Sequence, residues 1–519
     1  QYVLGLKAVN CHSGDVLANE QATANGKEQV LKALGDGATK LREKLGESLA
    51  SVQKYDAPPE NVTTPSLEAL QAYSLASQTM TVKNDAASAV PLFQRAISLD
   101  PNFAMAYARL GTSYSNLGQI TRAAENIRRA YDLRERVSER EELYIASHYE
   151  LFATGNLEAA RKTFELEAQT YPRDTVPHVN LSFIDAALGD YDKALAASLD
   201  SLRLSPGSGQ LYANLVVGYT DVNRVDEART TAQEAQANHL DNPLIHLSLY
   251  LIDFLQHDAA GMEREAAGLM GKAGFEDLML YAESDTAAYG GGFAKARELT
   301  RRASASAQRA DEKETAAGYE AEAGVREALV ANVGLAKQQA QTALALSTGR
   351  DVEAMSAIAL GLAGDSVQVA RLAEDLAKRF PEDTIVQSEY LPMIHAALAL
   401  ARGNPTEALQ SLTTAGPYEL GTYGLVNLYP VYLRGEAYLA ARQGSAAATE
   451  FQKIVDHACL VANEPIGALA HLGLGRAYVL SGDTAKAKSA YQDFFALWKD
   501  ADSDIPILKA ARTEYAKLQ

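Results

Sequence analysis

The residues that could carry out chemistry are scattered along this sequence and form no catalytic set. Its nine histidines include no pair four residues apart, the spacing that lets two imidazoles on one helix bind zinc. Asp500, Asp502 and Asp504 have the spacing of a calcium loop, but the sixth and twelfth loop positions are Ile505 and Ala511 instead of glycine and glutamate. The three glycines at 290–292 lack the Lys-Ser/Thr that follows a phosphate-binding loop. We therefore expect no enzyme, no metal site and no cofactor.

The charge and the cysteine content limit the classes of partner and site that this chain can have. The net charge is −18, which disfavours nucleic acid as a partner, and no run of 18 apolar residues predicts insertion into a membrane by this chain. The arginine pairs 128–129 and 301–302 fall within helical periodicity and are interpreted as solvated faces. Cys11 and Cys459 are interpreted as unpaired residues, and His148 and His257 as structural residues.

The elements that position these residues repeat along the chain. Glycine or a polar residue recurs at a nearly constant spacing, at Gly118, Gly155, Gly189, Asn223 and His257. Five positions after each of the first four stands an alanine: Ala123, Ala160, Ala194 and Ala228. Prolines that cannot continue a helix follow at Pro101, Pro172 and Pro206. This register predicts helix pairs of about 34 residues.

One repeat, residues 104–137, shows the physical reason for the pattern. Tyr107, Leu110 and Tyr114 share one face of its first helix, and Gly111 on that face lets the partner helix approach closely. Gly118 supplies the left-handed residue that ends the helix. A helix pair of this kind buries its apolar face only by stacking on neighbouring pairs. The pattern is typical of the tetratricopeptide repeat (TPR).

We predict an all-α fold: a right-handed TPR α-solenoid of about twelve helix pairs, preceded by a short β-hairpin and a helix. Residues 1–57 are expected to be a partial α/β segment, with strands at 2–9 and from 16 and an amphipathic helix over 26–54. The other expected parts are a linker at 58–65, a regular 34-residue array at 66–257, a longer-period array at 258–499 with turn glycines including Gly444, and a capping helix at 500–519 that begins with Asp504 as N-cap.

The first helices of such a solenoid line its concave face, where peptides bind. In this register the inward positions are Arg109, Thr112, Asn116, Tyr149, Asn180, Phe183, Asn214 and Asp221. Asn180 and Asn214 share one repeat position, where an amide can both donate to and accept from a peptide backbone. A solvated groove without a single ligand is the alternative.

Several phrases resemble a more specific family, the repeat regions of acidobacterial receptor-like Ser/Thr protein kinases. They are the segments 63–74, 137–141, 171–174, 380–384 and 496–509. The resemblance implies a TPR region outside the membrane, periplasmic or extracellular, with residues 1–57 belonging to a small α/β segment. It does not carry kinase activity to this chain, because no kinase glycine-rich loop, His-Arg-Asp or Asp-Phe-Gly motif occurs here.

The expected function is therefore a non-catalytic scaffold that binds a protein or peptide, as an extracytoplasmic sensor or binding region. The alternative is a self-assembling structural protein, whose copies form homo-oligomers or filaments through the solenoid ends or the N-terminal strand.

Overall fold

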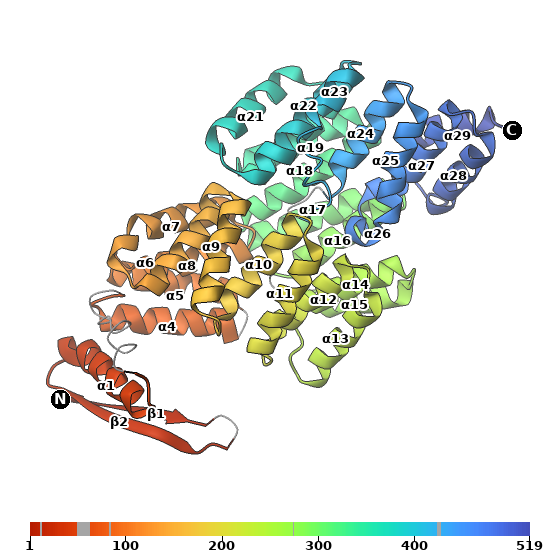
Figure 1. Cartoon of the computed structure of the whole chain (residues 1–519). Helices are drawn as coiled ribbons and strands as arrows, with labels where there is room; N and C mark the ends of the chain where they lie inside the picture. Colours follow the sequence, from red (N-terminus) through yellow and green to blue (C-terminus); the bar gives the residue numbers. More distant parts are fainter. Residues whose placement is uncertain (11–12, 49–62, 83–84, 273, 423–426) are drawn as a thin grey trace. The chain divides into compact units, whose positions relative to one another are not determined.

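The computed structural model describes residues 1–10, 13–48, 63–82, 85–272, 274–422 and 427–519. Over these ranges the chain is helical apart from one N-terminal β-hairpin (Figure 1). It divides into two compact units: residues 1–117 and 122–153 form unit 1, and residues 118–121 and 154–519 form unit 2. The predicted all-α solenoid with an N-terminal hairpin is confirmed. The finer domain boundaries stay a prediction.

Twelve helix pairs follow one another in the described ranges, as predicted. The first helices are α4 (Leu67–Val82), α6 (Ala104–Asn116), α8 (Glu139–His148), α10 (Thr175–Ala187), α12 (Gly209–Asp221), α14 (Pro243–Leu255), α16 (Glu276–Tyr289), α18 (Lys313–Leu329), α20 (Arg350–Leu362), α22 (Leu391–Ala401), α24 (Tyr429–Ala440) and α27 (Pro465–Leu480). The second helices are α5 (Ala86–Leu99), α7 (Ile120–Asp132), α9 (Leu157–Thr170), α11 (Tyr191–Leu204), α13 (Val225–Ala237), α15 (Ala259–Leu269), α17 (Phe293–Arg309), α19 (Val333–Leu346), α21 (Ser366–Arg379), α23 (Pro405–Ser411), α25 (Gly444–Asp456) and α28 (Thr484–Leu497).

Short segments complete the chain. They are the 3₁₀ turns Lys27–Gln29 and Arg134–Arg136, the π-helical segments η3 (Tyr149–Thr154) and η4 (Val386–Tyr390), α26 (Ala458–Val461) and α29 (Pro506–Ala516). The final helix, α29, begins as predicted with Pro506 in its first turn. Its N-cap is Ile505, not the predicted Asp504, and no side chain caps it.

A left-handed residue sits in the turn inside eleven of these pairs, with φ between 58° and 79°. These residues are Gly118, Gly155, Gly189, Asn223, His257, Gly291, Ala331, Gly364, Gly403, Arg442 and Gly482. The five turn positions of the predicted register are all among them, and Gly291 continues the same spacing one repeat after His257. Arg442, not the predicted Gly444, takes this conformation between α24 and α25. Gly444 instead begins α25, where a Cβ would lie 2.6 Å from the Ala477 carbonyl oxygen.

Close helix packing explains the helical glycine of the sequence pattern. A Cβ on Gly111 of α6 would lie 2.6 Å from Cγ1 of Ile127 on α7, so any side chain would push the two helices apart. Around this contact, Phe93, Leu110 and Ala123 belong to one core cluster of unit 1. Phe93 is fully buried, and burial of such a side chain stabilises the fold by roughly 1.5–3 kcal/mol.

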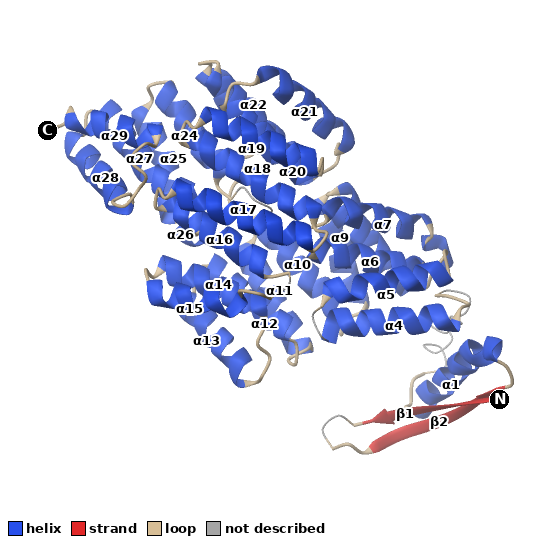
Figure 2. Ribbon diagram, turned by 180° about the vertical axis from the view of Figure 1, so that it is seen from behind, coloured by secondary structure: helices blue, strands red, loops and turns tan. Residues whose placement is uncertain are grey.

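The N-terminal hairpin pairs β1 (Tyr2–Val9) with β2 (Val16–Ala24), antiparallel, in the register Leu4 to Ala22. Helix α1 (Val30–Lys44) packs on one face of this two-stranded sheet (Figure 2). The predicted helix over 26–54 is therefore too long: α1 ends at Lys44, because Gly46 takes φ 86° and the Leu45 amide donates to the Leu41 and Arg42 carbonyls. Residues 49–62, with most of the predicted linker, lie outside the described residues.

Unit 2 contains contacts between segments far apart in the sequence. The Trp498 Nε1–H donates to the Tyr289 carbonyl oxygen at 2.9 Å, across 209 residues, and Asn463 Nδ2 donates to the Ala282 carbonyl at 2.7 Å, across 181. The Thr384 amide donates to the Gly155 carbonyl at 3.0 Å. The repeats of unit 2 therefore pack on more than their sequence neighbours.

A buried cluster of charges links α16, α17, α18 and the residue before α27. Arg326 of α18 donates to Asp285 of α16 and, at 2.9 Å, to Thr300 Oγ1 of α17. Glu322 lies one turn before Arg326 and is also buried, and Glu464, just before α27, accepts a hydrogen bond from the Tyr429 hydroxyl at 3.0 Å. The Arg326 guanidinium is thus the cation that acts on three carboxyl groups, those of Asp285, Glu322 and Glu464.

The carboxyl groups of this cluster titrate far from their usual range. Burial raises the pKa of Asp285 to about 6 and that of Glu464 to about 8, against the pull of Arg326. Burial also raises the pKa of Glu322 well above its ordinary value. Loss of Arg326 would therefore leave buried carboxyl groups without a cation and lower the stability of the unit 2 core.

Candidate peptide-binding face

The eight predicted inward residues divide between the two units: Arg109, Thr112, Asn116 and Tyr149 belong to unit 1, and Asn180, Phe183, Asn214 and Asp221 to unit 2. All but Tyr149, the first residue of η3, lie on the first helices of pairs. Each unit has its own arrangement of these side chains.

In unit 1 two of the predicted residues meet at one tyrosine. Arg109 Nη1 donates to the Tyr144 hydroxyl at 3.3 Å, and Thr112 Oγ1 lies 3.2 Å from the same oxygen. The Tyr144 ring stacks on His148 at 3.8 Å between centroids. Burial lowers the pKa of His148 to about 3, so its imidazole is neutral and its Nδ1 lies 2.7 Å from the Tyr144 carbonyl oxygen. Arg109 and Thr112 are therefore engaged within the protein.

The other two predicted residues of unit 1 do not join this group. Tyr149 stacks on Tyr131 of α7, with ring centroids 3.8 Å apart and planes 15° from parallel. Asn116 is exposed at the last turn of α6. Of the four predicted residues in unit 1, Arg109 and Thr112 are therefore the two that lie together at Tyr144.

In unit 2, Asn180 and Asn214 occupy matching positions on α10 and α12. Asn180 Nδ2 donates to the Val176 carbonyl at 2.9 Å, while Asn214 Oδ1 accepts from Gln210 Nε2 at 2.9 Å. Each side-chain amide therefore uses one of its two polar atoms, Nδ2 in Asn180 and Oδ1 in Asn214, for a hydrogen bond within its own helix. Among the described residues the structure records no hydrogen bond to Asn180 Oδ1 or Asn214 Nδ2, so one acceptor and one donor remain available.

Apolar side chains lie one turn further along the same helices. Phe183 is 43% exposed on α10, and Val217 is 46% exposed on α12. Val217 was missed by the sequence interpretation, although it stands one repeat length after Phe183 and two after Tyr149. The repeat register alone could have found it.

Asp221, at the last position of α12, is mostly enclosed. Burial raises the pKa of its carboxyl to about 7. Nearby, Cys459 of α26 donates its thiol to Asn223 Oδ1 at 3.1 Å and is a free cysteine, as predicted; Cys11 lies outside the described residues. The chain's own C-terminal half thus covers this end of α12.

A similar contact covers the end of α10. The Thr422 amide donates to the Ala186 carbonyl at 3.1 Å, and the Tyr191 hydroxyl donates to the Leu420 carbonyl. A Cβ on Gly421 would overlap the Ala187 carbonyl oxygen. Residues 412–422, which follow α23, therefore fit against α10 only because residue 421 is glycine.

We expect Gly421→Val to detach this segment from α10 and to lower stability by about 1–3 kcal/mol, the usual cost of overpacking. Hydrogen exchange of the Thr422 and Ala187 amides, followed by mass spectrometry, measures the opening. Gly416→Val in the same segment is the matched control, because Gly416 is exposed and a Cβ there meets only ordinary contact distances. Equal exchange in the two variants would contradict the role given to Gly421.

The remaining chemistry is limited. In the part of the chain that the structure describes, no group of three or more His, Cys, Asp or Glu side chains could hold a metal ion. None of the described helices combines the length and apolarity needed to cross a membrane.

Comparisons with known proteins agree with the repeat architecture. The tetratricopeptide repeat family profile matches residues 92–125, which run from α5 through α6 into α7. No curated protein matches the sequence significantly. The chain therefore contains a tetratricopeptide repeat at residues 92–125, within a TPR-like array of helix pairs.

The solved structures that match the chain are distant from it in sequence. Yeast Tom70 is 14% identical over 87% of this chain and 95% of that one, with a TM-score of 0.35. A chain of the APC/C hetero-tetramer Cut9–Hcn1 is 13% identical over 95% of this chain and 94% of that one, with a TM-score of 0.41. A human IFIT1 dimer solved with PPP-AAAA is 14% identical over 84% and 91%, with a TM-score of 0.36.

Proposed function

We propose that the chain binds an extended peptide along α10 and α12 of unit 2. The observation that carries this proposal is the repeated pair of an amide and an exposed apolar side chain, Asn180 with Phe183 and Asn214 with Val217. The free acceptor and donor of the two amides complement a peptide backbone, and the apolar side chains provide contact area.

The spacing of the helices suits this ligand. Packed helices lie about 8–10 Å apart, and an extended chain rises about 3.3 Å per residue. Successive repeats therefore contact peptide residues about three positions apart. Backbone recognition by amides selects an extended conformation, while the apolar positions select side chains.

The test is selection of a phage-displayed random decapeptide library on the purified chain. We expect Asn180→Ala/Asn214→Ala to weaken the selected peptides by about tenfold or more, because each lost hydrogen bond is worth about 1 kcal/mol. Phe183→Ala should weaken them as well. Leu199→Ala is the matched control, since Leu199 is equally exposed, 43%, but lies on the second helix α11. Selected peptides that bind all these variants alike would refute this face.

The extracytoplasmic, kinase-associated location is a further part of the proposal and is supported only by the resemblance of the five segments named above. The comparisons with known proteins give no support to a kinase association. The gene sequence upstream of Gln1 tests it: a kinase domain followed by a membrane helix is the expected result, and a cytoplasmic domain joined without a membrane helix would contradict it.

Self-assembly is the second candidate function, favoured by the hairpin. The sheet face opposite α1 is exposed, including Val3 at 61% and Leu17 at 58%, and a two-stranded sheet has two free edges. Light scattering over a concentration series tests it. A mass that rises with concentration and falls back in Val3→Lys/Leu17→Lys supports assembly; a constant monomer excludes it.

A further inference from the structure

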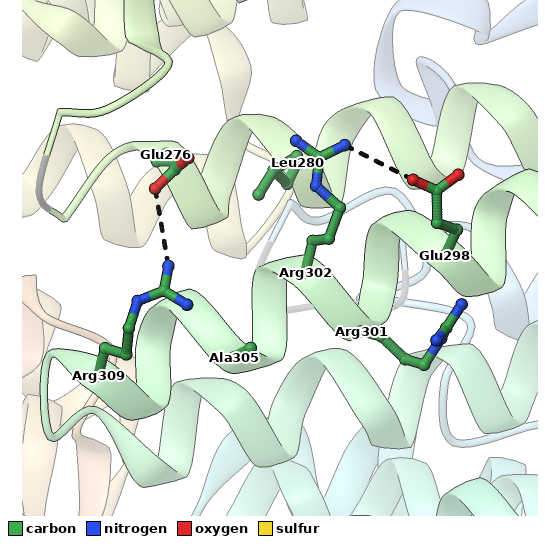
Figure 3. Close-up of a pocket in the computed structure, with 7 residues that line it drawn as sticks. All are labelled: Glu276, Leu280, Glu298, Arg301, Arg302, Ala305 and Arg309. Atoms are coloured by element: carbon green, nitrogen blue, oxygen red, sulfur yellow. Dashed lines mark ion pairs between the residues drawn. The ribbon is translucent and has the colours of Figure 1, made fainter.

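A groove lined by arginines lies between α16 and α17 in unit 2 (Figure 3). Its volume is about 410 Å³, its floor includes Leu280, and Arg301, Arg302 and Arg309 project along its α17 side. Helix α17 carries five cationic residues and one acidic residue, Glu298. In a chain of net charge −18 this is a local reversal of sign.

The groove arginines are only loosely paired. Glu298 accepts from Lys295 at 2.9 Å, whereas its distance to Arg302 is 3.8 Å. Arg309 lies 3.9 Å from Glu276, and Arg301 has no ion pair among the described residues. Distances of 3.8–3.9 Å exceed those of hydrogen bonds. The guanidinium N–H groups of the groove therefore remain able to bind carboxylates in the bidentate geometry that arginine favours.

An apolar hollow lies between α15 and α16. It has a volume of about 360 Å³ and is lined by Met262, Ala266 and Met270. Met270 also packs against the core cluster that contains Leu280, on the floor of the arginine groove. Glu283 borders this hollow, and its carboxyl lies close enough to Arg302 for the cation to lower its pKa against the effect of burial.

We propose that the surface across α15, α16 and α17 binds an acidic peptide that carries an apolar side chain. Its carboxylates pair with Arg301 and Arg302, and its apolar side chain enters the hollow at Met262 and Met270. Two glutamates border each part, Glu263 and Glu283 at the hollow and Glu276 and Glu298 at the groove, but only the groove is lined by arginines. The arginines therefore set the direction of the peptide, with its carboxylates toward α17.

A peptide fits this surface better than nucleic acid does. The residues that line the arginine groove include no aromatic ring on which a base could stack. The acidic chain as a whole also repels a polyanion. This site is separate from the proposed face on α10 and α12, so either can fail without the other.

The probe is the peptide fluorescein-Gly-Leu-Glu-Glu-Leu-Glu-Glu-Gly-amide, followed by fluorescence anisotropy with the full chain. We expect replacement of its glutamates by glutamine, or of its leucines by serine, to weaken binding about tenfold or more. Arg301→Glu/Arg302→Glu should cause a similar loss, and Asn180→Ala/Asn214→Ala should cause none.

The control variant is Arg203→Glu/Lys499→Glu, which reverses two charges whose side chains are each 76% exposed elsewhere in unit 2. Circular dichroism of both double variants confirms folding. The proposal is overturned if the wild-type chain does not bind the acidic probe, if the glutamine peptide binds equally well, or if the control variant loses as much affinity. Tighter binding of labelled oligo(dT) through Arg301 and Arg302 would also overturn it and would identify a nucleic-acid surface.

Discussion

Arg326→Met should destabilise unit 2 by about 3–5 kcal/mol near pH 8, the usual cost of leaving a buried charge without its partner. Methionine keeps most of the arginine volume but removes the only cation that the cluster supplies to Asp285, Glu322 and Glu464. It also removes the hydrogen bond to Thr300 Oγ1. The segments joined at this cluster should then separate more easily.

The stability lost in Arg326→Met should increase as the pH rises. Folded-state pKa values of about 6 for Asp285 and about 8 for Glu464 lie above the ordinary carboxyl value of about 4. Groups with raised pKa favour folding below their unfolded pKa and lose that contribution as the pH rises through the folded value. Removal of Arg326 raises these values further, so the variant should lose stability relative to the wild type above about pH 6, where Asp285 of the wild type ionises, and should approach the wild type at pH 5.

Thermal unfolding at pH 5 and pH 8.5, with hydrogen exchange of α16 and α18, measures this effect. Arg203→Met is the matched control, because the Arg203–Asp200 pair is exposed and such pairs contribute less than about 1 kcal/mol. Asp285→Asn in the Arg326→Met background should restore part of the stability at pH 8.5. An equal loss at both pH values would show that Arg326 acts through packing and not through its charge.

The helix pairs could be predicted because their signals are local. Each turn needs one left-handed residue, and Gly118, Gly155 and Gly189 mark it directly in the sequence. Asn223 and His257 take the same conformation without being glycine, and only their regular spacing revealed them. Arg442 also has a regular spacing, 39 residues after Gly403, but Gly444 was predicted in its place because it is a glycine.

The contacts inside unit 2 could not be predicted in this way. Asp221 occupies an inward repeat position, yet segments from the distant C-terminal part of the chain enclose this end of α12. No periodicity within a repeat encodes a contact between Asn223 and Cys459. The repeat register therefore places a side chain on a helix face but does not say whether that face is open.

The surroundings of charged residues could not be predicted for the same reason. Arg326 and Glu322 lie within an alternating charged stretch that is typical of a solvated helix, but α18 is buried on most of its faces. Arg301 and Arg302 are exposed, as predicted for a solvated face, and the structure adds that they line a groove with Leu280. Electrostatic roles thus depended on the tertiary contacts of these helices.

Phe451→Ala should lower stability by about 3–5 kcal/mol, the range for a fully buried phenylalanine. The Phe451 ring of α25 lies in a slot between two glycines on the neighbouring first helices. A Cβ on Gly435 of α24 would lie 2.8 Å from the ring, and a Cβ on Gly473 of α27 would lie 2.6 Å from it. The two glycines thus allow a ring to occupy the space between α24 and α27.

Gly473→Ala should therefore cost about 1–3 kcal/mol, although alanine is the better helix former by about 1 kcal/mol. Gly318→Ala is the matched control: Gly318 lies within α18, nothing approaches within 4 Å of its added Cβ, and the substitution should stabilise the chain. In the Gly473→Ala/Phe451→Leu double variant the smaller side chain frees space for the new methyl group. Its loss of stability, measured by chemical denaturation, should be less than the sum of the two single losses, because the residues share one contact. Additive losses would show that the ring and Gly473 do not compete for the same space.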